Sequence, residues 1–162
     1  MTLWEAVVPY ELLDTWVFPI TVLSTFWMLA IIWFVQIVHY PLFQHVGENA
    51  FSAYHNRHEW WTTWIVGPPM FLEATGSFYL YLHPPFLEHS VAWGAGFLLV
   101  LVPLTSTAFL QVPQHSTLRD GYHPETIRSL VRWNWIRTAA WTMRGGICIY
   151  LLVQAMTLVS PQ

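Results

Sequence analysis

The chain has 162 residues, of which 55% are hydrophobic and only 9% are charged. A soluble globular domain carries about 25% charged residues, so this composition predicts one integral-membrane domain covering residues 1–162. The net charge of −3, with six arginines as the only Lys or Arg residues, argues against nucleic acid as a partner, and the single Cys148 excludes a disulfide framework.

Four apolar segments are long enough to cross a bilayer, which takes about 20 helical residues. In chain order they are residues 16–38, 62–82, 90–112 and 135–159. With their polar extensions, the expected helices cover about 16–40, 49–82, 90–112 and 126–159. Because backbone polar groups must be satisfied inside lipid, the sequence predicts an all-α bundle of four transmembrane helices.

The arginines outside these segments lie on one side of the predicted membrane. Arg57 lies in the first connection, whereas Arg119, Arg128 and Arg132 lie in the third. The N-terminal arm, the second connection and the C-terminal tail contain no Lys or Arg. The positive-inside rule therefore puts both termini on the non-cytoplasmic side of a bacterial cytoplasmic (inner) membrane. We expect a multi-pass protein with the lipid bilayer as a partner.

Four of the eight histidines lie in one stretch, residues 39–61, "HYPLFQHVGENAFSAYHNRHEWW". His55 and His58 are three residues apart and share a helical face, a spacing that di-iron bundles use for ligands. His39 ends the first helix and His115 ends the third. Imidazole suits several transition metals, so the candidate metal ligands are His39, His55, His58 and His115. A haem iron is a second candidate cofactor, and an interfacial segment rich in amphipathic rings is the competing interpretation.

Polar residues on the third and fourth helices extend this candidate site. A polar side chain facing lipid is costly, so we expect these residues to point into the bundle at its cytoplasmic end. The candidate catalytic residues are His55, His58, Asn134 and Arg137. The candidate cofactor-binding residues are His39, His115, Gln111 and Trp133.

Glu73 and Arg144 lie deep inside the second and fourth apolar segments. An unpaired charge at that depth is costly, so we expect the two side chains to form an intramembrane ion pair. Two interpretations stay open for this pair. It either links the two helices structurally or lines a substrate, proton or quinone pocket.

The stretch at 111–144, "QVPQHSTLRDGYHPETIRSLVRWNWIRTAAWTMR", resembles small four-helix bacterial membrane proteins, as do "HYPLF…YHNRH" and "VGPPMFLEA". These proteins are distantly similar to the anthrone-oxygenase-like family. In that family a Pro-rich turn ends the third helix, and a Trp/Asn…Arg pattern opens the fourth. The matching residues here are Pro113, Trp133, Asn134 and Arg137. The resemblance implies a four-helix membrane fold and an oxygenase activity, whereas the extra histidines depart from the family pattern and favour a metal.

Three functions follow as alternatives. The first is a membrane oxidoreductase or oxygenase that acts on a lipophilic small molecule, with His as base or ligand and Arg137 stabilising a developing oxyanion. The second is a non-catalytic subunit of a larger membrane complex that binds haem, a metal or a pigment. The third is a small transporter, which with only four helices would have to form a homo-oligomer.

Overall fold

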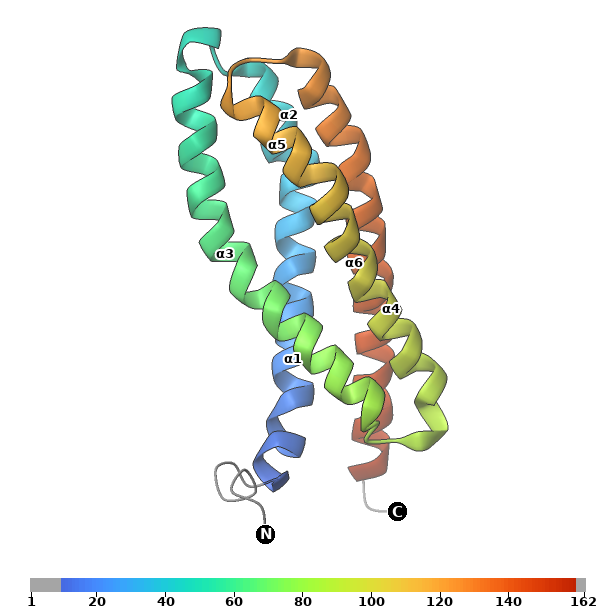
Figure 1. Cartoon of the computed structure of the whole chain (residues 1–162). Helices are drawn as coiled ribbons and strands as arrows, with labels where there is room; N and C mark the ends of the chain where they lie inside the picture. Colours follow the sequence, from blue (N-terminus) through green and yellow to red (C-terminus); the bar gives the residue numbers. More distant parts are fainter. Residues whose placement is uncertain (1–9, 160–162) are drawn as a thin grey trace.

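The computed structural model describes residues 10–159, with side chains from Thr15 to Thr157. Over this range the chain folds into four long helical rods joined by short turns, which confirms the all-α prediction (Figure 1). Residues 1–9 of the N-terminal arm, which contribute to the predicted orientation, lie outside the described residues.

Most of the rods contain more than one helical segment. The first consists of α1 (Tyr10–Phe34), the π-helix η1 (Val35–His39), α2 (Tyr40–Leu42) and the 3-10 helix η2 (Phe43–His45). The second is α3 (Glu48–Leu82), followed by the short η3 (Leu87–His89). The third consists of α4 (Ser90–Ser106), the π-helix η4 (Thr107–Gln111) and α5 (Val112–Arg119), and the fourth is α6 (Pro124–Val159).

The rods pack side by side as a bundle. α1 contacts α3 and α6, and α4 contacts the same two helices, so α1 and α4 occupy opposite corners. The described chain begins and ends at one end of the bundle, and α2 and α5 lie at the other, which we call the α2–α5 end (Figure 1). α3 changes direction near its middle, where Pro68 and Pro69 interrupt the backbone hydrogen bonds.

Two π-helical turns interrupt the first and third rods near the α2–α5 end. In each, a backbone N–H bonds to the carbonyl five residues earlier, Tyr40 to Val35 and Val112 to Thr107. Both π-helices end two residues before a proline, Pro41 or Pro113. Proline has no N–H and clashes with the carbonyl four residues before it, which favours a wider preceding turn. The third rod therefore continues through Pro113 to Arg119, beyond the expected end near residue 112.

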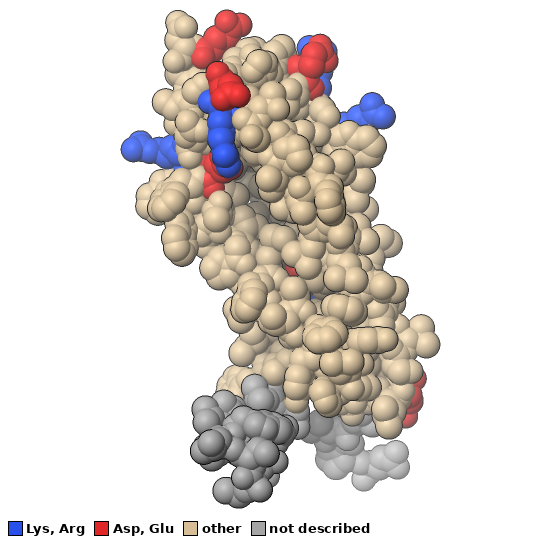
Figure 2. Space-filling view, viewed as in Figure 1, with Lys and Arg blue, Asp and Glu red and all other residues tan. Residues whose placement is uncertain are grey.

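The outer surface of the bundle is apolar. Large exposed hydrophobic side chains occur on every rod, including Leu23, Trp27, Phe71, Leu98, Phe109 and Met143. Figure 2 shows exposed charges gathered mainly at the α2–α5 end, above a broad band of uncharged surface. Soluble monomers rarely expose apolar patches larger than a few hundred Å². Two rods, Thr15–His45 and Leu87–Arg119, are long and apolar enough to cross a membrane, which supports a membrane protein.

Candidate functional site

The structure brings the four candidate histidines together near the α2–α5 end. His39 comes from η1, His55 and His58 come from α3, and His115 comes from α5. His39 Nε2 lies 2.7 Å from His58 Nδ1, and His55 Nε2 lies 2.9 Å from His115 Nδ1. The centroids of neighbouring rings are separated by 4.4 to 6.2 Å. We call these four residues the His cluster.

The ring nitrogens of the His cluster pair with each other. Between Thr15 and Thr157, no three His, Cys, Asp or Glu side chains are arranged to hold a metal ion. A haem iron with two axial imidazoles needs room for a flat macrocycle between the rings. The rings of the cluster are instead in mutual contact, so this arrangement does not fit haem. A transition metal stays a prediction without support from the geometry.

Burial favours the neutral forms of His55 and His58. Burial, followed by the neighbouring His39, His115 and His55, lowers the pKa of His58 from 6.5 to about 3. Burial also lowers the pKa of His55. At the rim, Arg119 Nε donates to Glu59 Oε2 at 2.7 Å, and this hydrogen bond lowers the pKa of the Glu59 carboxyl. At neutral pH the rim therefore holds a paired carboxylate and His58 carries no charge.

Tyr40 connects the His cluster to a cleft. Its hydroxyl oxygen lies 3.0 Å from His115 Nε2, and the other nitrogen of His115 faces His55. The Tyr40 side chain is 4% exposed and follows directly on η1. Enzymes activate a hydroxyl with a base that accepts its proton and a third group that orients the base. Here Tyr40 is the hydroxyl, His115 the base and His55 the orienting group. The sequence did not single out Tyr40, because a tyrosine in an apolar segment resembles any core aromatic residue.

The cleft has a volume of about 220 Å³ and is bordered by all four rods, room for part of a small ligand. Its polar lining consists of Tyr40, Glu59, Thr62, Thr63, Thr107, His115 and Arg137. Its apolar lining consists of Val66, Gly67 and Met70. Along α3 the lining thus changes from polar to apolar within three helical turns, which suits an amphiphilic molecule.

Arg137 lies in the wall of this cleft and is only 7% exposed. Its guanidinium carbon lies 5.4 Å from the centre of the Trp141 ring, a cation–π contact. Arg137 forms no ion pair with any carboxylate of the described residues, and its Nε has no hydrogen-bond partner there. The buried hydroxyl of Thr107, in the same cleft, is also without a partner in this part of the chain. The cleft therefore contains two unsatisfied polar groups.

The other candidate residues lie outside the cleft. Asn134 is fully buried and donates from Nδ2 to Gln36 Oε1 at 2.9 Å, which joins α6 to η1. Gln111 is also buried, and it accepts a hydrogen bond from a serine of its own rod. Trp133 is 39% exposed and lies beneath the Arg132 guanidinium, so the structure does not bring it to the His cluster.

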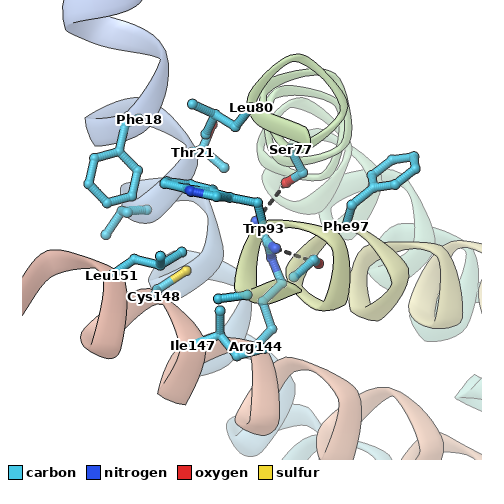
Figure 3. Close-up of a pocket in the computed structure, with 13 residues that line it drawn as sticks. Phe18, Thr21, Ser77, Leu80, Trp93, Phe97, Arg144, Ile147, Cys148 and Leu151 are labelled. Carbon is cyan, nitrogen blue, oxygen red and sulfur yellow. Dashed lines mark hydrogen bonds between the residues drawn. The ribbon is translucent and has the colours of Figure 1, made fainter. Parts of the chain in front are cut away.

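Glu73 and Arg144 lie farther from the α2–α5 end and face each other in the bundle interior. Glu73 accepts hydrogen bonds from Thr25 Oγ1 at 2.8 Å, Trp141 Nε1 at 2.9 Å and Arg144 Nε at 2.8 Å. Arg144 also donates to Ser77 Oγ and to the Gly96 carbonyl, each at 2.6 Å, as the dashed lines in Figure 3 show. These contacts join all four rods, and they satisfy both charges within the protein.

A small cavity lies beside Arg144, next to Trp93 and Cys148 (Figure 3). Its volume is about 20 Å³, the scale of a single water molecule. No organic substrate fits there. Of the two interpretations of the Glu73–Arg144 pair, the contacts and this cavity size favour the structural link.

A scan against protein-family models finds no match, and searches of curated proteins and of solved structures find none either. The resemblance to the anthrone-oxygenase-like family therefore stays an expectation from the sequence. The geometry of the cleft and the His cluster is the basis for assigning a function.

Proposed function

We propose that the protein is a multi-pass protein of the bacterial cytoplasmic membrane, with all four rods crossing the bilayer and both termini outside. The apolar outer surface of every rod supports this proposal. The exposed arginines also support it, because all of them belong to segments at the α2–α5 end, which the positive-inside rule assigns to the cytoplasm. These arginines are Arg57, Arg119, Arg128 and Arg132.

In this membrane protein, residues of the cleft catalyse proton transfer from a lipophilic substrate. The observation behind this assignment is the hydrogen-bonded chain from Tyr40 through His115 to His55, which opens on the cleft beside Arg137. Tyr40 takes a proton from an acidic O–H or C–H of the substrate and passes its own proton to His115 Nε2. The substrate anion is left beside the Arg137 guanidinium, which stabilises it.

The enzyme class that this proton transfer supports best is an oxidoreductase or oxygenase. Removing a proton from a phenol, a quinol or an enolisable C–H makes the molecule electron-rich, and such anions are oxidised more readily than their neutral forms. Dioxygen from solution is the proposed oxidant, which accepts the electrons that the substrate anion loses. The bilayer would supply lipophilic compounds of this kind directly to the bundle.

Oxygen uptake by the purified protein tests the proposal, with anthrone, menadiol and 1-naphthol as substrates. Tyr40→Phe is expected to slow uptake by about a hundredfold or more, because it removes a general acid–base group. Tyr150→Phe is the matched control, since its hydroxyl also bonds to a histidine, His89 Nδ1 at 3.1 Å, toward the other end of the bundle. Uptake by Tyr40→Phe equal to that of the wild type would contradict the assignment.

A further inference from the structure

Two arginines of α6 show what a buried guanidinium requires in this bundle. Arg144, 4% exposed, donates to the Glu73 carboxylate and to further acceptors, and these partners together come from the three other rods. Arg137, 7% exposed, has no ion-pair partner within the described residues, and its Nε is unsatisfied. A buried charge without a counter-charge is strongly destabilising. A negatively charged ligand in the cleft would provide the counter-charge that Arg137 lacks.

The charge balance of the cleft limits this ligand to a single negative charge. Glu59 is the only carboxylate that lines the cleft among the described residues, and it is paired with Arg119. Arg137 therefore contributes one uncompensated positive charge. A neutral head group would leave it unpaired, and a dianion such as a phosphate monoester would bring one negative charge in excess.

The shape and lining of the cleft indicate an apolar body attached to the charged head. Beyond Thr62 and Thr63 the lining continues along α3 as Val66, Gly67 and Met70. A Cβ atom added at Gly67 would meet no atom within 4 Å, so the space beside this glycine is open. An extended or flat apolar group can lie there while the head reaches Arg137.

We propose that the cleft binds a monoanionic amphiphile, with its ionised carboxylate, phenolate or enolate oxygen against Arg137 and Thr107. Its apolar body lies along Val66 and Met70. Thr107 donates its hydroxyl hydrogen to the anion, which satisfies the second unpartnered group of the cleft. The identification of this amphiphile as a substrate rests on the proposed function, whereas its binding requires no turnover.

Binding of dodecanoate and dodecanol tests the proposal, because the two molecules share a chain length and differ in the charge of the head. Calorimetry at pH 8 on the protein in nanodiscs of zwitterionic lipid, corrected with empty nanodiscs, gives both dissociation constants. Dodecanoate is expected to bind about tenfold to a hundredfold more tightly, as charge-assisted hydrogen bonds to a buried guanidinium would give. Dodecyl phosphate, a dianion at this pH, is expected to bind more weakly than dodecanoate.

Variants on the same helix assign the preference to one residue. Arg137→Gln is expected to abolish the preference for dodecanoate, and Arg137→Lys to retain part of it. Arg132→Gln removes an exposed positive charge from the outer face of α6 and is expected to bind as the wild type does. Thr107→Val keeps every charge and is expected to weaken dodecanoate binding severalfold, so the test stands even if Arg137→Gln fails to fold.

Equal binding of dodecanoate and dodecanol, or a folded Arg137→Gln variant that keeps the preference, would overturn the inference. Tight dodecanoate binding by a protein that consumes no oxygen would support the inference and count against the proposed function alone. The two failures can therefore be told apart.

Discussion

Trp141 contacts Arg137 and also Glu73, the ion-pair partner of Arg144. Its Nε1 donates to Glu73 Oε2 at 2.9 Å, and its ring lies under the Arg137 guanidinium. The side chain is fully buried among Met28 and Ile32. Because the indole is fixed by Glu73 on one edge, the satisfied ion pair also holds the platform on which Arg137 rests.

The Glu73–Arg144 pair is expected to show strong coupling. Glu73→Gln and Arg144→Met each leave one buried charge uncompensated, which costs about 3–5 kcal/mol, whereas the double variant leaves none. Thermal unfolding in detergent of both single variants and the double variant measures the coupling. The exposed pair Glu125 and Arg128, 3.2 Å apart, is the control and should show almost none. Additive losses at Glu73 and Arg144 would mean that the two side chains act independently.

The stability of the protein is expected to depend on pH through His58, which lies outside the apolar span 62–82. Burial lowers its pKa from 6.5 to about 3, so the unfolded chain binds more protons between these pH values. The contribution of His58 to the free energy of unfolding should therefore be largest above about pH 6.5 and decrease as the pH falls from 6.5 to about 3. Below about pH 3, His58 is protonated in both states and causes no further change. Melting temperatures from pH 3 to 8 should show a shallower fall for His58→Asn than for the wild type. The exposed His123→Asn serves as control, and equal slopes for all three proteins would contradict the assignment.

At the residue scale, the sequence could predict contacts that charge or helical spacing requires. Glu73 and Arg144 have opposite charges at similar depth, so their approach followed from the cost of leaving either unpaired. The roles of Tyr40 and Thr107 could not be predicted in this way. Both belong to residue types that are common in apolar helices, and only their positions around the cleft distinguish them.

At the element scale, the two π-helices mark the level of the candidate site. η1 carries His39 and the buried Gln36, and η4 carries Thr107 and Gln111. Such turns are rare and occur often at functional sites. Apolar periodicity cannot reveal them, because one wider turn changes the pattern of a long hydrophobic segment very little. The prolines that follow were their only local signal in the sequence.

The contact between α1 and α3 is expected to depend on Gly76. A Cβ atom at this position would lie 2.0 Å from Thr21 Oγ1, whose hydroxyl donates to the Val17 carbonyl at 2.7 Å. Gly76→Ala must therefore separate the helices or displace Thr21, at a cost of about 1–3 kcal/mol. Gly67→Ala, on the same helix but with no atom within 4 Å, should be neutral or stabilising. Equal melting temperatures for the two variants would contradict this account.

At the scale of the whole molecule, the predicted topology can be tested by labelling. Glu88 lies in the turn before α4 with its side chain 68% exposed, and Asp120 lies in the exposed turn after α5. A cysteine at Glu88 is expected to react with a membrane-impermeant reagent in intact cells, and a cysteine at Asp120 only after lysis. The native Cys148 is buried and should give little background. The reverse pattern would invert the orientation of the bundle.

The number of helices and their approximate limits could be predicted because they follow from four apolar segments. Within the described residues, two of the four rods are long and apolar enough to qualify as spans by composition. α3 and α6 contain Glu73, Arg137 and Arg144, which lower their mean hydropathy while pointing into the bundle. Whether such helices can cross a membrane depends on whether their charged side chains are paired inside the bundle. The mean hydropathy of a segment does not contain that information.

The π-helical turns have a consequence for the tolerance of the chain to changes in length. Each turn holds one residue more than an α-helix would place there, and Phe109, 76% exposed, lies on the outside of one of them. Deleting Phe109 would let the turn close to an ordinary α-helix while α5 keeps its direction. Deleting a residue from the regular part of α4 would instead rotate everything that follows by about 100° and turn His115 away from His55. Deleting Phe109 is therefore expected to keep His115 directed at His55, at the cost of placing Pro113 inside a regular α-helix.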